Sequence, residues 1–213
     1  MDESTLRFAL TALVTLLVVV DPVGVAPMFM AVTREQSSDA RRATLLRAIV
    51  VAALVALFFL LAGHVLLSYL GVSVHAFAIS GGILLFATAL PMLFGHRPVL
   101  QGPERDDVQR AEDPAVFPLA IPLLSGPGTI ATLLLLASEA RGDVMRMTTL
   151  VAVTGGVFLL AWAILSTAER LLERLGPGGI NILTRVLGLV LSALAVQYVL
   201  NGLGGYYETL VQR

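Results

Sequence analysis

The sequence contains no cysteine and no lysine, and it has few charged residues of any kind. Without cysteine, the chain cannot form disulfides, use a thiol nucleophile or bind a metal through thiolates. The 14 basic residues, all arginines, nearly balance the 15 acidic ones, and the formal net charge is −1. The charges lie between apolar runs and form no basic patch, so the sequence does not predict nucleic-acid binding.

What the sequence has in abundance is apolar residues. They make up 57% of the 213 residues, against 14% that are charged, and the mean hydropathy is +0.87. Apolar runs of this length can cross a bilayer as helices, which predicts an all-α polytopic membrane protein. The predicted spans cover residues 6–32, 48–69, 76–94, 115–137, 147–168 and 180–200.

Two of these spans are interrupted by proline and glycine. Residues 121–132 read Ile-Pro-Leu-Leu-Ser-Gly-Pro-Gly-Thr-Ile-Ala-Thr, and residues 21–29 read Asp-Pro-Val-Gly-Val-Ala-Pro-Met-Phe. A proline removes a backbone donor and frees a carbonyl that hydrocarbon cannot satisfy, so such breaks survive only where they face protein or a wet cavity. We therefore expect both breaks to lie near the bilayer midplane beside a buried site.

The two halves of the chain follow the same plan of one broken span and two continuous ones. Pro22 corresponds to Pro127, and Gly82 corresponds to Gly188. Because each half has an odd number of spans, the second must be inverted relative to the first, as in many secondary transporters. We expect a first three-helix repeat over residues 1–94, a charged cytoplasmic linker over 95–114 and an inverted repeat over 115–213.

Arginines concentrate in the segments that follow the first, third and fifth predicted spans. They are Arg34, Arg41, Arg42, Arg47, Arg97, Arg105, Arg110, Arg170 and Arg174. Segments rich in arginine near span ends remain on the cytoplasmic side. The prediction is a multi-pass protein with both termini in the periplasm.

Four motifs resemble the MarC family of bacterial inner-membrane proteins over nearly the whole chain. Asp-Pro-Val-Gly-x-x-Pro-Met-Phe begins at Asp21, and Pro-Leu-Ala-Ile-Pro-Leu-Leu-Ser-Gly-Pro-Gly-Thr-Ile begins at Pro118. Ser-Gly-Gly-Ile-Leu-Leu-Phe begins at Ser80, and Thr-Arg-Val-Leu-Gly-Leu-x-Leu-x-Ala-Leu-Ala-Val-Gln begins at Thr184. The family resembles small neutral amino-acid transporters and is grouped with LysE-type exporters. The resemblance implies amino-acid movement across the inner membrane, with export as one of the two directions. Many relatives have asparagine in place of Asp21.

The breaks themselves suggest how an amino acid would bind. If the helices restart near Ala26 and Thr129, each second half begins with unpaired N–H groups and the positive end of a helix dipole. A carboxylate would accept hydrogen bonds there, helped by a serine or threonine hydroxyl, while the ammonium group faces Asp21 or freed carbonyls. The candidate substrate-binding residues are Asp21, Pro22, Gly24, Pro27, Ser125, Gly126, Pro127, Gly128, Thr129, Arg185 and Gln197.

Each candidate also has a purely structural interpretation. The glycines and prolines would let helices pack closely. Asp21 is either an ionisable group that couples protons to substrate or a helix cap. Arg185 pairs with Asp21, binds a carboxylate or extends to the interface, and Gln197 lines the path or bonds a neighbouring helix. Pairs of small residues serve either as packing notches or as a homodimer face: Ala78/Gly82, Ala152/Gly156 and Gly188/Ser192.

No pattern predicts an enzyme or a cofactor. His64, His75 and His96 lie at span ends without companion ligands at metal spacing, and Ser125 has no histidine within any span. The expected partners are a small neutral amino acid, membrane lipid and a second copy of the chain. The alternatives to a transporter are a structural or assembly protein of the membrane and a channel for small solutes or ions.

Overall fold

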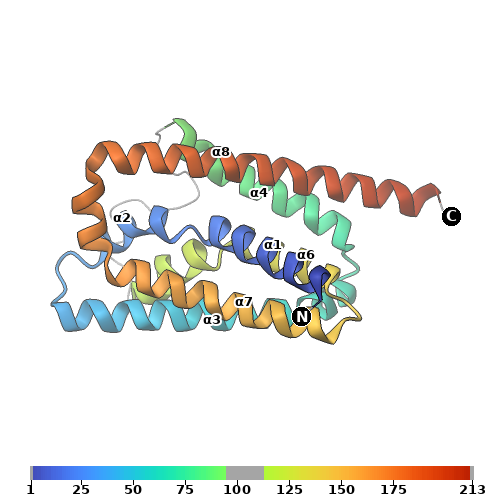
Figure 1. Cartoon of the computed structure of the whole chain (residues 1–213), viewed down its shortest axis with the longest axis horizontal. Helices are drawn as coiled ribbons and strands as arrows, with labels where there is room; N and C mark the ends of the chain where they lie inside the picture. Colours follow the sequence, from blue (N-terminus) through green and yellow to red (C-terminus); the bar gives the residue numbers. More distant parts are fainter. Residues whose placement is uncertain (1, 95–112, 212–213) are drawn as a thin grey trace.

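The computed structural model describes residues 2–94 and 113–211, and within them all regular structure is helical. Figure 1 shows the helices running mostly along one axis, with both chain termini toward the same end. The elements are α1 (Glu3–Val20), α2 (Pro22–Val32), α3 (Ser38–Tyr69), α4 (Val74–Phe94), η1 (Ala115–Leu124), α6 (Pro127–Glu139), α7 (Val144–Ser166) and α8 (Ala168–Val211). Most of the predicted linker, residues 95–112, lies outside the described residues.

The lengths and composition of these helices are those of membrane spans. In the described part of the chain, five helical stretches are long and apolar enough to cross a bilayer, one of them formed by α1 and α2 together. A sixth span results if η1 and α6, which are bent by 51° at their junction, cross as one broken unit. The prediction of an all-α polytopic membrane protein is confirmed.

Two predicted span boundaries differ from the helices. α3 begins at Ser38 rather than at residue 48, because the Ser37 hydroxyl accepts a hydrogen bond from the Ala40 N–H at 3.3 Å and starts a helix whose first turns are charged. α8 covers Ala168–Val211 rather than 180–200, and it bends at Gly176, where φ is 61° and ψ is 174°. Hydropathy marks the part of a helix that lies in hydrocarbon, whereas both helices continue beyond it.

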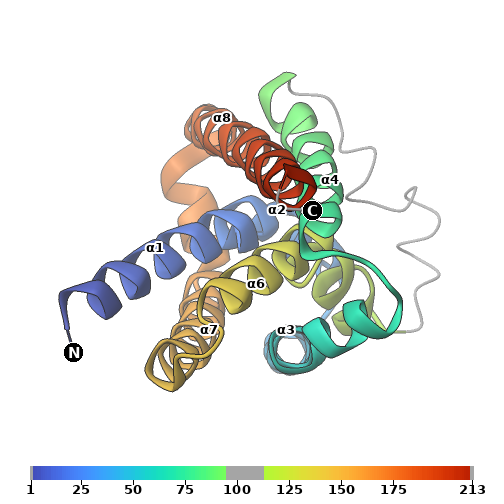
Figure 2. The same ribbon diagram turned by 90° about the vertical axis from the view of Figure 1, so that its right-hand side faces the viewer.

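The apolar interior is divided into two clusters. The larger cluster joins α1, α2, α3, η1, α6, α7 and the first turn of α8, and the smaller one is formed by α4 and the later part of α8, with side chains of α1 and α6 packed against it. Figure 2 shows α4 and α8 side by side, on the opposite side of α1 and α6 from α3 and α7. We refer to these two helices as the α4–α8 pair.

Glycines bring the two helices of this pair close together. A Cβ atom at Gly82 would lie 2.6 Å from the Ala195 carbonyl oxygen, and one at Gly188 would lie 2.8 Å from the Met92 Cβ. These positions are therefore packing notches between α4 and α8. Gly156, by contrast, has no atom within 4 Å of an added Cβ, so the notch on α7 packs against nothing within the described chain.

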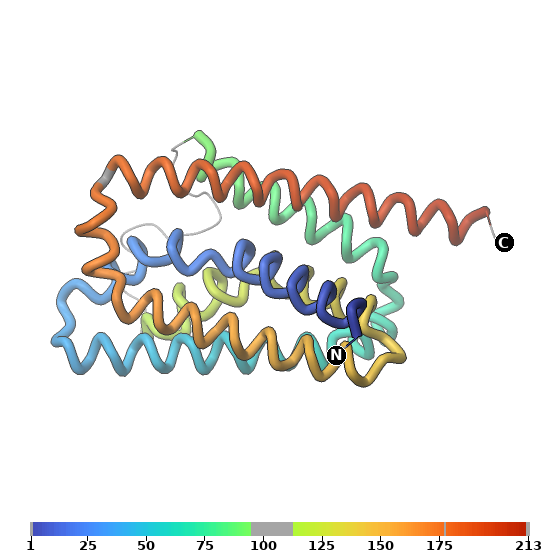
Figure 3. The backbone as a smooth tube through the Cα atoms, in the orientation of Figure 1, coloured from blue at the N-terminus to red at the C-terminus, as the bar shows by residue number. Residues whose placement is uncertain are grey.

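Two of the arginine-rich segments, those after α2 and after α7, lie at one end of the bundle. The connections from α2 to α3 and from α7 to α8 both lie at the end away from the chain termini (Figure 3). Arg41 of α3 pairs there with Glu169 of α8 at 3.4 Å, and Arg47 pairs with Asp113 at 3.1 Å. This arrangement is the one that the arginine count predicts for the cytoplasmic end, while the side of the membrane on which it lies stays a prediction.

Candidate functional site

Asp21 forms the first break by ending one helix and capping the next. Its backbone is left-handed, with φ 44° and ψ 62°, and its N–H still donates to the Leu17 carbonyl of α1 at 3.1 Å. Its Oδ1 accepts from the Gly24 N–H at 3.0 Å, which caps α2. The helix thus restarts at Pro22 and not near Ala26 as expected, since proline is well suited to the first helical position.

Gly24 leaves the space that the Asp21 carboxylate occupies. A Cβ atom at this position would overlap Oδ2 of Asp21. Oδ2 makes no hydrogen bond within the described residues, whereas Oδ1 holds the cap. One oxygen of the carboxylate is therefore structural and the other is available.

The second break is longer because two prolines lie within it. Phe117 and Ile121, which precede Pro118 and Pro122, have extended backbones with ψ 124°, as expected for residues before proline. The Ser125 N–H then donates to the Ala120 carbonyl at 2.9 Å in a wide turn, and α6 starts at Pro127. The chain restarts as a helix two residues before the expected position near Thr129.

The two hydroxyls that the sequence suggested as ligands in this break, those of Ser125 and Thr129, are already engaged. Ser125 is buried, and its Oγ donates to the Ala52 carbonyl of α3 at 2.6 Å. Thr129 Oγ1 donates to the Leu124 carbonyl at 3.0 Å. The hydroxyl of Ser125 thus fastens the break to α3 instead of serving a ligand, and Thr129 donates its proton across the break.

The N-terminus of α6 is left without a side-chain cap. Gly126 occupies the cap position and offers no side-chain acceptor, and the Ile130 N–H donates to the Gly126 carbonyl at 3.0 Å. The preceding N–H groups, those of Gly128 and Thr129, have no helical acceptor. This positive helix end can therefore accept an anion, whereas the corresponding end of α2 already holds the Asp21 carboxylate.

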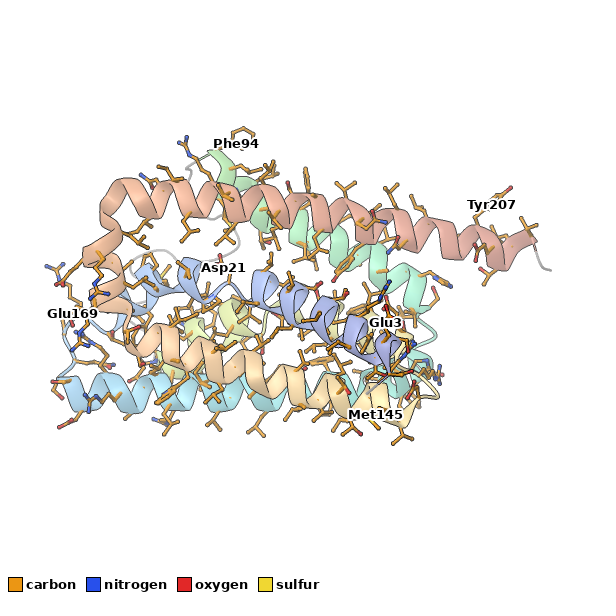
Figure 4. All side chains as sticks on the ribbon, viewed as in Figure 1. Glu3, Asp21, Phe94, Met145, Glu169 and Tyr207 are labelled. Atoms are coloured by element: carbon orange, nitrogen blue, oxygen red, sulfur yellow. The ribbon has the colours of Figure 1, made fainter. Side chains whose placement is uncertain are left out.

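The two breaks line the same cavity, which has a volume of about 550 Å³. The α4–α8 pair forms its other side. Figure 4 places Asp21 between α1 and α2, well inside the length of the bundle. The lining residues are Val19, Val20, Asp21, Gly24, Val25, Pro27, Leu84, Leu85, Thr88, Pro91, Met92, Phe94, Pro122, Leu123, Gly126, Pro127, Gly128, Thr129, Asn181, Thr184, Arg185 and Leu191.

Eight of the eleven candidate residues from the sequence lie in this lining, and three do not. Pro22 is buried behind the break, and Ser125 points to α3. Gln197 is exposed on α8, where its amide donates to Asn201 Oδ1 of the same helix at 2.7 Å. The expectation that Gln197 lines the path or bonds a neighbouring helix is wrong, because the turn of α8 directs this position outward.

Arg185 lines the cavity, and within the described residues it forms no ion pair with Asp21. These two are the acidic and the basic residue of the lining, and their ionised forms are opposite in sign. The cavity thus has a negative group at the first break, and a guanidinium and an open helix N-terminus elsewhere in its wall.

Three polar lining residues were not predicted from the sequence: Thr88, Asn181 and Thr184. Asn181, Thr184 and Arg185 follow the i, i+3, i+4 spacing that places side chains on one face of a helix. That spacing was the available signal for the two residues of α8. Thr88 carried no such signal, because it stands alone in an apolar run and its hydroxyl donates to the Leu85 carbonyl at 2.7 Å.

The helices define a polytopic α-helical membrane protein, and a cavity lies between its two breaks. The family described as MarC family integral membrane protein matches residues 6–207, and the chain belongs to this family. The family resemblance noted in the sequence is confirmed.

Curated relatives match along almost their whole length. UPF0056 membrane protein PYRAB13050 of Pyrococcus abyssi is 36% identical over 194 residues, which cover 91% of this chain and 93% of the relative. UPF0056 inner membrane protein YhgN of Escherichia coli K12 is 36% identical over 195 residues, which cover 91% of this chain and 95% of the relative. No solved structure matches the chain significantly.

Proposed function

We propose that this protein is a secondary transporter of small neutral amino acids and that the cavity is its substrate site. The observation that carries the proposal is the set of groups in the cavity wall that have no ion-pair or hydrogen-bond partner of opposite kind among residues 2–94 and 113–211. One oxygen of Asp21 supplies an acidic group, Arg185 supplies a basic one, and the α6 N-terminus adds the N–H groups of Gly128 and Thr129. An amino acid carries one ammonium and one carboxylate group, so it complements this wall without altering its net charge.

The substrate carboxylate would accept hydrogen bonds at the N-terminus of α6. The amides of Gly128 and Thr129 point out of the helix there, and the helix dipole favours an anion. Arg185 adds a guanidinium on the opposite wall, with Asn181 and Thr184 beside it on the same face of α8.

The substrate ammonium would donate to Oδ2 of Asp21. The other oxygen of this carboxylate is held by the Gly24 N–H at 3.0 Å, which fixes the orientation of the group. Asp21 therefore acts as a cap and as a ligand at the same time, and the two interpretations left open by the sequence are compatible.

The rest of the wall favours a small and uncharged side chain. Valine, leucine, proline, methionine and phenylalanine side chains supply most of the remaining lining. A charged side chain would need a further charged partner, whereas Asp21 and Arg185 are both used by the main-chain groups of the substrate. Gly128 packs so closely against Leu85 that a Cβ atom would overlap Leu85 Cδ2, so the wall is tight at this point.

The placement of the breaks supports transport by an inverted-repeat mechanism. α2 and α6 each restart at a proline and each contribute to one cavity, as expected of two broken helices in equivalent repeats. Within this proposal the protein is not an enzyme. It lies in the bacterial inner membrane with both termini in the periplasm, and two copies can associate as a homodimer. The family resemblance implies amino-acid movement, with export as one of the two directions.

Exchange in proteoliposomes tests the proposal against its two alternatives. Vesicles loaded with unlabelled alanine should take up labelled alanine faster than vesicles without internal substrate, because a carrier returns more quickly when loaded. Equal uptake with and without internal alanine would indicate a channel. No uptake beyond that of protein-free vesicles would favour the structural or assembly role.

A further inference from the structure

The cavity ends toward one end of the bundle at a layer of contacts between the α4–α8 pair and α6. The lining residues nearest this end are Leu84 on α4, Thr129 on α6 and Leu191 on α8. Within two turns along the same helices, toward the end of the bundle that carries the chain termini, α4 packs against α6, and a side chain of α8 reaches α6. The four residues of this layer are Gly81, Ala131, Thr132 and Tyr198, and we call it the terminal gate.

A single buried hydrogen bond joins α8 to α6 in the terminal gate. Tyr198 Oη donates to Thr132 Oγ1 at 3.1 Å, and the side chains are 8% and 0% exposed. Neither residue lines the cavity. This bond fixes the relative position of the two helices, because either hydroxyl would lose its partner if the helices separated.

The second contact of the terminal gate is a close approach of α4 to α6. Gly81 lies so near Ala131 that a Cβ atom at position 81 would overlap the Ala131 methyl group. The two backbones can approach this closely only because one of the residues is glycine. The contact leaves no room for a solute between the helices.

The α4–α8 pair has the features of a unit that can move. Its two helices share their own apolar cluster, against which side chains of α1 and α6 pack, whereas the first turn of α8, before Gly176, belongs to the larger cluster through Ala168. Gly71, in the turn before α4, has φ 68°, and Gly176, at the bend of α8, has φ 61°. Neither has any atom within 4 Å of an added Cβ, so both hinge positions are free of packing. Hinges of this kind commonly join bodies that move as units.

We propose that the terminal gate opens when the α4–α8 pair moves away from α6, which connects the cavity with the membrane side that carries the chain termini. The Tyr198–Thr132 hydrogen bond and the Gly81–Ala131 contact separate together in this step. The purpose of the gate rests on the proposed transport function, but its opening can be measured without any substrate.

Since the chain has no cysteine, one introduced thiol reports the opening directly. Thr88→Cys places this thiol in the cavity. Vesicles in which a C-terminal tag is exposed are selected, so that the chain termini face outward. A membrane-impermeant maleimide is then added from outside. Tyr198→Phe and Thr132→Val, each in this background, should raise the labelling rate about fivefold, since each removes one buried hydrogen bond. Ser192→Ala is the matched control on α8, because the Ser192 hydroxyl donates to the Leu189 carbonyl within its own helix at 2.8 Å.

A methyl exchange between α4 and α6 tests the second contact. Gly81→Ala should raise the labelling rate by forcing the helices apart, and Gly81→Ala/Ala131→Gly should restore the original rate by removing the overlapping methyl group. If Gly81→Ala fails to fold, Tyr198→Phe still decides the question, because it removes only one oxygen atom.

The outcomes separate the gate from the transport proposal. Unchanged labelling in Tyr198→Phe, Thr132→Val and Gly81→Ala overturns the gate, whether or not the protein exchanges alanine. Faster labelling in these variants supports the gate, and it does so even if the parent protein exchanges no alanine, a result that would refute only the proposed substrate.

Discussion

At the scale of single residues, Asp21 links the fold to the proposed chemistry. Its left-handed backbone ends α1, its Oδ1 caps α2, and its Oδ2 remains available in the cavity wall. Aspartate and asparagine are the non-glycine residues that most readily adopt this conformation. The same property that makes this residue type suitable for the break also places a carboxylate in the middle of the bundle.

Asp21→Asn should separate the two tasks of this side chain. Asparagine can adopt the left-handed conformation and can still accept from the Gly24 N–H, so the melting temperature should change little. Alanine affinity should fall about tenfold because a charge-assisted hydrogen bond becomes a neutral one. Proton-gradient-driven accumulation should disappear while exchange persists, as measured in proteoliposomes at saturating alanine.

Asp21→Ala is the matched comparison, because it removes the cap as well as the charge. It should cost about 2–3 kcal/mol of stability, because it loses the N-cap and places an alanine in the left-handed conformation. If Asp21→Asn instead keeps its accumulation and its pH dependence, the carboxylate has a structural role alone.

Gly128 tests the tight point of the cavity wall. Gly128→Val should abolish exchange while folded protein stays in the membrane. The new side chain, at the start of α6, would overlap Leu85 of α4. Combining Gly128→Ala with Leu85→Ala should recover part of the exchange rate, since the second change makes room for the added methyl group. Normal exchange by Gly128→Val would place the substrate site elsewhere.

At the scale of helices, the sequence predicted the breaks better than the helix ends. Clustered proline and glycine identified both interruptions, because their backbone restrictions act locally and need no knowledge of the fold. The start of α3 at Ser38 and the full extent of α8 were missed, because charged turns outside the membrane lower hydropathy without ending a helix.

The bend of α8 depends on the conformation of Gly176. Gly176→Ala should lower stability by about 1–3 kcal/mol, because φ 61° with ψ 174° is a region that only glycine adopts easily. Gly178→Ala is the control, as it also has no atom within 4 Å of an added Cβ but lacks a positive φ. Thermal unfolding in detergent measures both, and equal melting temperatures would contradict the glycine requirement at the bend.

At the scale of the whole molecule, the sequence predicted which segments form the site but not all of the residues in its wall. Hydropathy and motifs carry little information about helix rotation, and this rotation directs Gln197 outward and brings Asn181 and Thr184 to the cavity. The Tyr198–Thr132 bond was likewise missed, because it joins two helices whose contact depends on tertiary packing.

Competition binding to the purified protein tests most directly whether the cavity recognises both charged groups of an amino acid. Unlabelled alanine should displace labelled alanine, while alaninamide, which lacks the carboxylate, and propionate, which lacks the ammonium group, should each compete about a hundredfold more weakly, because each leaves one charged group of the wall unpaired. Equal competition by all three compounds, or no binding of alanine at all, would contradict the account.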